Sequence, residues 1–196
     1  MQRPTRREIL IATTSVGVGG ALALILERRH AGLRATTGAA SMQTPAPIAQ
    51  ATTLEALTEA EFLTLAAACE RIYPQDDAPG ALTLGVPIFI DRTLAAERLP
   101  AWADGLLTSA ARLDVESFRR FAVPFAAASA ANQDALIADW AAERDSDNAR
   151  FVKHLVTATL EGVLSDPTHG GNRDRAGWRT FALGADPYAP SEVHRP

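Results

Sequence analysis

Residues 58–73 read TEAEFLTLAAACERIY, and this stretch decides the fold class. Thr58 and Glu61 have the spacing of a capping box, in which each side chain bonds an otherwise unpaired backbone N–H of the other at a helix start. Apolar residues then follow at three- and four-residue intervals, the period of one helix face. We therefore expect a helix that ends at Tyr73, just before Pro74.

The same helical spacing continues along the rest of the chain. We expect a second helical region from about Ala81 to Pro100, interrupted at residues 85–87, and three further helices. These span about 101–121, a stretch that begins at Ser129, and about 148–164. There is no period-two alternation longer than about four residues, so we expect an all-α fold, an irregular bundle of about five helices. The core positions expected in the last three helices are Trp102, Leu106, Leu113, Phe118, Leu136, Ile137, Trp140, Phe151, Leu155, Val156, Thr159 and Val163.

The composition agrees with one helical domain. The chain has 196 residues, of which 47% are hydrophobic, and its 39 alanines are the residues with the highest helix propensity. We assign residues 54–196 to a single helical domain and residues 41–53 to a flexible linker. Beyond residue 40 the chain carries 13 basic and 21 acidic side chains, a difference of −8, which disfavours nucleic-acid binding. Cys69 is the only cysteine, which excludes an internal disulfide, a CxxCH haem site and a cysteine-ligated cluster.

Residues 1–40 are typical of a twin-arginine export signal. Arg6 and Arg7 are followed by one variable residue, then Ile9 and Leu10, and an uncharged run extends to Leu26. The run contains glycines and hydroxyl residues, so it is only mildly hydrophobic. The alternative is a membrane anchor that is never removed, since this run has about the length of a spanning helix.

The segment SDPTHGGNRDRAGW, residues 165–178, is unlike the helices before it. Its glycines allow positive φ angles, Asn172 and Asp174 can bond their own backbone, and Arg173 carries a planar fork suited to carboxylates. We interpret this segment as a partner-binding loop. The candidate interface residues are His169, Gly170, Gly171, Asn172, Arg173, Asp174 and Trp178.

Other interpretations of this region stay open at the level of sequence. The loop could instead cap the bundle, with Arg173 or Asp174 paired internally and Trp178 in the core. A phosphate-binding loop is less suited, because such loops usually follow a strand and open a helix. Asp166, His169 and Asp174 could hold a metal ion, although no second imidazole lies nearby. In the helix before the loop, His154 and Glu161 share a face and could pair.

Two stretches of the chain together resemble a known family. They are LTEAEFLTLAAACERIYPQDDAPGALTLGVPIFIDRTL, residues 57–94, and TLEGVLSDPTHGGNRDRAGW, residues 159–178. They resemble the small subunit (subunit 3, or gamma) of the gluconate 2-dehydrogenase type of membrane-associated FAD-dependent dehydrogenases. The chain departs from the family pattern at Leu164, where an aromatic residue is common, and in its tail, FALGADPYAPSEVHRP.

The resemblance implies a non-catalytic accessory subunit without a cofactor of its own. Its partners would be a large FAD-dependent subunit of the glucose–methanol–choline type, in some complexes a multihaem cytochrome c carrying haem c, and the twin-arginine translocon. The chain would stabilise the large subunit and escort it during export. The complex would be periplasmic and membrane-associated, either through its other subunits or through an uncleaved N-terminal segment.

Two other function classes remain at this stage. One is an independent periplasmic enzyme that uses His169 or His154 with Asp166 and Asp174. The other is a membrane-anchored structural protein that has no flavin partner. The residues do not favour the enzyme, because no nucleophile stands beside a base and no dinucleotide-binding glycine fingerprint is present. The structural protein would keep its N-terminus in the membrane and copurify with no flavin.

Overall fold

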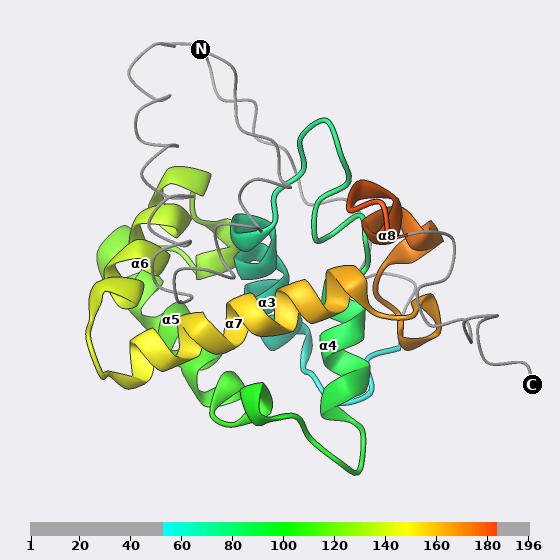
Figure 1. Ribbon diagram of the computed structural model, residues 1–196. Coiled ribbons are helices and arrows are strands. Elements are labelled where there is room, and N and C mark those ends of the chain that lie inside the picture. Colours follow the sequence, from blue (N-terminus) through cyan, green and yellow to red (C-terminus); the bar gives the residue numbers. More distant parts are fainter. Residues whose placement is uncertain (1–52, 184–196) are drawn as a thin grey trace, which may run out of the picture.

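The computed structural model describes residues 53–183, and Figure 1 shows these as a bundle of helices without strands. The predicted all-α fold is therefore confirmed for this part of the chain. None of the described helices is both long and apolar enough to cross a membrane. The α-helices are α3 (Glu59–Ile72), α4 (Val86–Leu94), α5 (Leu106–Phe121), α6 (Ala130–Ala142), α7 (Asp147–Leu164) and α8 (Ala176–Thr180).

Helix α3 is the centre of the bundle, in contact with α4, α5, α6 and α7 (Figure 1). It begins as predicted: the Thr58 hydroxyl accepts a hydrogen bond from the Glu61 N–H, and the Glu61 carboxylate accepts one from the Thr58 N–H. Tyr73 caps its C-terminal end. Its inner face includes Leu65 and Cys69, which are fully buried. A local capping signal thus positions the helix around which the others pack.

The second helical region is shorter than predicted. Residues 81–85 form a turn, and α4 starts after Gly85 and ends at Leu94 rather than near Pro100. Asp91 of α4 is buried, and its carboxylate accepts hydrogen bonds of 2.9 to 3.0 Å from three successive backbone N–H groups, at residues 55–57. This carboxylate fastens the chain entering the domain to α4.

The predicted third helix is broken near its start. Residues Ala101–Ala103 form a 3₁₀ turn, Gly105 takes a left-handed conformation, and α5 begins at Leu106. Phe118, predicted to face the core, is 60% exposed instead. The residue before it, Ser117, is fully buried, with its hydroxyl bonded to the Val123 carbonyl. Because neighbouring helical residues point about 100° apart, burial of Ser117 turns Phe118 outward.

Helix α7 packs across α3 and leads directly into the predicted partner-binding loop. Its buried face includes Leu155 and Val163, as predicted. The possible pair between His154 and Glu161 is not formed. The Glu161 carboxylate accepts a 2.6 Å hydrogen bond from the Trp102 indole, whereas the His154 ring lies 3.3 Å from the Asp104 carbonyl oxygen. Both side chains hold the segment before α5 against α7.

Candidate functional site

The loop between α7 and α8 is organised around the side chain of Asn172. This residue is fully buried, and its amide donates to the Ser165 carbonyl at 2.9 Å while its oxygen accepts from the Gly177 N–H at 2.8 Å. Its backbone N–H donates to the Gly162 carbonyl. One side chain therefore closes the loop, because it links the end of α7 to the start of α8.

Trp178 also holds this loop against the end of α7. It is 1% exposed, and its indole N–H donates to the Leu164 carbonyl at 2.9 Å, in the last turn of α7. The guanidinium of Arg175 lies 5.7 Å from the centre of the Trp178 ring, within cation–π range. Trp178 therefore serves the interior of the domain, in agreement with the interpretation of the loop as a cap on the bundle.

The backbone of the loop lies too close to α7 for side chains at some positions. A Cβ atom at Gly171 would be 2.3 Å from the Gly162 carbonyl oxygen and 2.6 Å from the Ser165 hydroxyl. Real Cβ atoms do not approach backbone this closely, so any larger residue at 171 would push the loop away from the helix. Gly170 before it is half-buried, with φ at 98°.

Three residues after the glycines adopt left-handed backbone conformations. They are Asn172, Asp174 and Arg175, with φ of 43°, 57° and 56°. Asn and Asp tolerate this region, but for an arginine it costs about 1 to 2 kcal/mol. Such a conformation persists only where the surroundings hold it, and here the hydrogen bonds of Asn172 and the contact of Arg175 with Trp178 do so.

The structure divides the seven predicted interface residues into two groups. Gly171, Asn172 and Trp178 are buried, and Gly170 is half-buried. The exposed members are His169, Arg173 and Asp174, which lie on the two short 3₁₀ turns Pro167–His169 and Arg173–Arg175. In the described part of the chain the Arg173 guanidinium forms no hydrogen bond or ion pair. Its backbone is held on both sides, because its N–H donates to the Leu84 carbonyl at 3.0 Å and its carbonyl accepts from the Ala176 N–H. The buried residues thus form a scaffold that presents the exposed ones.

Asp166 has a structural role at the start of the loop. Both the hydroxyl and the backbone N–H of Thr168 donate to its carboxylate, and these bonds lower the pKa of the Asp166 carboxyl. Within residues 53–183, no three His, Cys, Asp or Glu side chains are grouped as metal ligands would be, and Asp166, His169 and Asp174 form no such group.

The sequence analysis did not predict that α4 and the turn before it contact the loop after α7. Arg92 donates to the Thr168 carbonyl at 3.3 Å, and its guanidinium lies 3.7 Å from the Glu55 carboxylate. Gly85 lies directly against the loop: a Cβ there would be 2.4 Å from the Gly170 carbonyl oxygen. The glycine at position 85 could have indicated a close backbone contact. The residues around it do not identify the contacting segment, which lies about eighty residues later in the chain.

One known protein family matches most of the part of the chain that the structure describes. The family model described as gluconate 2-dehydrogenase subunit 3 matches residues 59–183, which include both α3 and the complete loop. The chain belongs to the gluconate 2-dehydrogenase subunit 3 family. Members of this family are accessory subunits of a dehydrogenase complex, so a larger catalytic partner is expected. Searches of curated proteins and of solved structures find no match to the chain.

The resemblance noted from the two motifs is thereby confirmed for the family. The arginines of the predicted export signal, Arg6 and Arg7, lie outside the described residues and outside the matched range. The export signal and the interface assignment of the loop therefore stay predictions.

Proposed function

We propose that the chain is the non-catalytic small subunit of a periplasmic FAD-dependent sugar or alcohol dehydrogenase of the glucose–methanol–choline type. It would stabilise the large flavoprotein subunit and escort it through the twin-arginine translocon. The observation that carries this proposal is that a member of the subunit 3 family has a rigidly held loop after α7 with exposed charged residues on it. Its buried residues hold the backbone, and its exposed charged residues are left for a partner.

Arg173 is the central contact in this proposal. Its guanidinium is exposed, and its backbone is fixed by the bond to Leu84 and by the neighbouring Asn172. A planar guanidinium can form two parallel hydrogen bonds with a carboxylate of the partner. Because the backbone is already ordered, binding costs less conformational entropy than it would on a flexible loop. His169 and Asp174 would complete the contact on either side.

The proposal divides the cofactors between subunits. FAD would be bound by the large subunit and haem c, where present, by a cytochrome subunit, with none in this chain. The chain purified alone should then be colourless and inactive as a dehydrogenase. Stoichiometric flavin, haem or metal in the isolated chain would contradict this division and favour an independent enzyme.

Export provides a separate test. The translocon receptor recognises the arginine pair, and lysine lacks the planar guanidinium. We expect the double substitution Arg6→Lys and Arg7→Lys to leave both this chain and the flavoprotein in the cytoplasm. Normal amounts of both proteins in the periplasmic fraction would contradict the signal assignment and the escort role.

Assembly is tested by tagging the chain at its C-terminus in the native host, purifying it and recording the flavin absorbance. We expect Arg173→Ala to reduce recovery of the flavoprotein about tenfold while the melting temperature changes by less than about 3 °C. Arg150→Ala is the matched control, because Arg150 is an exposed arginine in the first turn of α7, about 20 Å along the helix from the loop.

Three outcomes would contradict parts of this proposal. Recovery with Arg173→Ala equal to that with Arg150→Ala would exclude Arg173 as a contact. Full recovery with His169, Arg173 and Asp174 all changed to alanine would exclude the loop. A wild-type chain that retains no flavoprotein would exclude the subunit role itself.

A further inference from the structure

Helix α4 and the loop after α7 are in direct contact. The side chains of Ile88 and Arg92, one turn apart on α4, lie against the backbone of Gly170. A Cβ atom at Gly170 would be 2.8 Å from Ile88 Cγ2 and 3.3 Å from Arg92 Nη1. The Arg92 guanidinium also donates to the Thr168 carbonyl at 3.3 Å. The first half of the loop therefore rests on one face of α4.

The turn before α4 supports the second half of the loop, which carries Arg173. The Leu84 carbonyl accepts from the Arg173 N–H at 3.0 Å. The Arg173 guanidinium lies close to Gly85, where a Cβ atom would be 3.6 Å from its Nη2. The position of Arg173, the central contact of the proposed assembly, thus depends on this turn and α4 as well as on Asn172.

The same helix holds the segment by which the chain enters the domain, residues 54–57, which we call the entry segment. The buried Asp91 carboxylate accepts hydrogen bonds from three of its backbone N–H groups. The Arg92 guanidinium lies 3.7 Å from the carboxylate of Glu55 in this segment. Because Arg92 also contacts the loop, two neighbouring residues of α4 connect the entry segment with the loop.

The strength of this connection comes from Asp91 rather than from the ion pair of Arg92. The Arg92 and Glu55 side chains are 44% and 52% exposed, and so exposed a pair adds little stability. Asp91 is 1% exposed, so its carboxylate and its donors would lose buried hydrogen bonds if α4 moved. Helix α4 has 9 residues, too few to be stable alone, and depends on such contacts for its place. Loosening of the entry segment should therefore reach the loop through α4.

We propose that Asp91 and Arg92 are positioning residues for the loop after α7. They fix α4 between the entry segment and the loop, and so hold His169 and Arg173 where the flavoprotein would bind them. Asp91 would act without touching the partner, because it is buried. This role in binding rests on the assembly described under Proposed function.

The coupling would act in both directions, because two coupled sites strengthen each other by the same factor. A flavoprotein that orders the loop would therefore also tighten the hold of α4 on the entry segment. The entry segment joins residues 1–53, which include the predicted export signal, to the domain. Partner binding would thus affect the point at which that signal is attached.

Hydrogen exchange of the isolated full-length chain tests the coupling without any partner. We expect Asp91→Asn to speed exchange about tenfold or more at residues 55–57, and about threefold or more at loop N–H groups such as that of Arg173. Asp114→Asn is the matched control, because this carboxylate of α5 also accepts a backbone N–H, from Phe125 at 2.8 Å. It should leave loop exchange within about twofold of wild type. Unchanged loop exchange in Asp91→Asn would overturn the proposal.

A substitution of Arg92 leaves the buried carboxylate of Asp91 intact. Arg92→Met keeps an unbranched side chain against Gly170 but removes the donor. We expect it to speed loop exchange about twofold to threefold, and to reduce recovery of the flavoprotein severalfold with the tagged chain. Arg92→Lys keeps a charged donor and should restore most of both.

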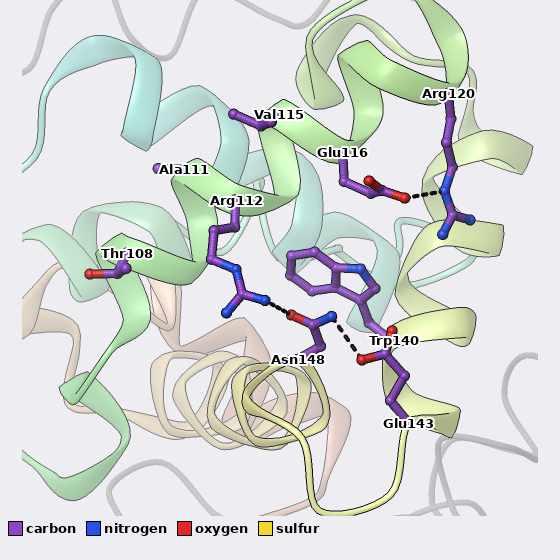
Figure 2. A pocket seen from close by; sticks show the side chains of 9 residues that line it. All are labelled: Thr108, Ala111, Arg112, Val115, Glu116, Arg120, Trp140, Glu143 and Asn148. Atoms are coloured by element: carbon purple, nitrogen blue, oxygen red, sulfur yellow. Dashed lines mark hydrogen bonds and ion pairs between the residues drawn. The ribbon is translucent and has the colours of Figure 1, made fainter.

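Arg112→Met is the matched control for this substitution. Arg112 is 49% exposed, donates to the Asn148 oxygen at 2.8 Å and lies 4.0 Å from the Asp147 carboxylate, contacts of the same kinds as those of Arg92. Figure 2 shows Arg112 in a groove of about 560 Å³ between α5, α6 and the start of α7. This groove lies at the opposite end of α7 from the loop, so Arg112→Met should change neither loop exchange nor recovery.

Two results would exclude the role of Arg92. Loop exchange and recovery with Arg92→Met equal to those with Arg112→Met would show that Arg92 does not position the loop. Reduced recovery with unchanged loop exchange would make Arg92 a direct contact of the partner and overturn its positioning role.

The purified complex tests the reverse direction of the coupling. Exchange at residues 55–57 should be about threefold or more slower in the complex than in the isolated chain. Protection confined to the loop would overturn the coupling. A wild-type chain that retains no flavoprotein would overturn the subunit role, whereas exchange in the isolated variants would still decide whether α4 couples the two segments.

Discussion

Replacing Asn172 by alanine should destabilise the domain far more than the loss of one polar side chain on a loop would suggest. The substitution removes the bonds to the Ser165 carbonyl and to the N–H groups of Gly177 and Trp178. The first two partners would then be left buried without a hydrogen bond, at about 1 to 3 kcal/mol each. Alanine also tolerates the φ of 43° less well than asparagine does. The expected loss in free energy of unfolding is about 3 to 6 kcal/mol.

Two further substitutions separate these causes. Asn172→Gly loses the same hydrogen bonds but has no Cβ atom to strain the left-handed backbone, so it should be about 0.5 to 1 kcal/mol more stable than Asn172→Ala. Asn132→Ala is the control, because Asn132 lies near the start of α6 without a side-chain hydrogen bond among the described residues, and its change should be within about 0.5 kcal/mol.

Thermal unfolding of the full chain followed by circular dichroism measures these differences. A loss of this size corresponds to a fall in melting temperature of roughly 10 to 20 °C for a domain of this length. A melting temperature for Asn172→Ala within about 3 °C of wild type would show that the loop does not depend on this side chain. A glycine variant less stable than the alanine variant would refute the argument from backbone strain.

Three other predictions concern buried and charged groups. Burial raises the pKa of the Cys69 thiol to about 12, so native protein at pH 8 should not react with iodoacetamide, whereas unfolded protein should react fully; fast labelling of native protein would contradict its burial. Hydrogen bonds from Arg119 and Arg120 lower the pKa of Glu116 to about 2, below its ordinary value of 4.5. The stabilisation that ionised Glu116 provides is therefore complete above about pH 4.5 and is lost as the pH falls towards 2. The melting temperature of Glu116→Gln should depend less on pH across this range than that of the wild type. Equal pH dependence of the two melting temperatures would exclude this contribution. In Asp91→Asn the side-chain NH2, itself a donor, replaces one of the two oxygens that accept from the backbone N–H groups of residues 55–57. The free energy of unfolding should fall by about 2 to 4 kcal/mol, and these backbone N–H groups should exchange hydrogen faster. Unchanged exchange would mean that the carboxylate does not hold the segment.

The sequence by itself determined the features that depend on neighbours within a few residues. The capping box at Thr58 and Glu61 and the apolar spacing of α7 predicted two helices close to their observed bounds, and the hydroxyl cap at Ser129 predicted where α6 begins. These signals are readable because helix hydrogen bonds and caps join residues three or four apart. The two motifs that carry the family resemblance were readable in the same way, as patterns in the chain.

Only the tertiary structure decided which side of each element is covered. Periodicity marks Phe118 as apolar but does not distinguish a face against α3 from a face left open beside the groove, and the small residue Ser117 took the buried position. The residues of one sequence motif in the loop likewise divide into buried and exposed ones. The side chains of Asn172 and Trp178 are hydrogen-bonded to carbonyls at the end of α7, whereas the Arg173 side chain is exposed. Its close contact with Gly85 joins segments about eighty residues apart. Such contacts arise when preformed helices pack, and the spacing of residues along the chain does not encode which surfaces meet.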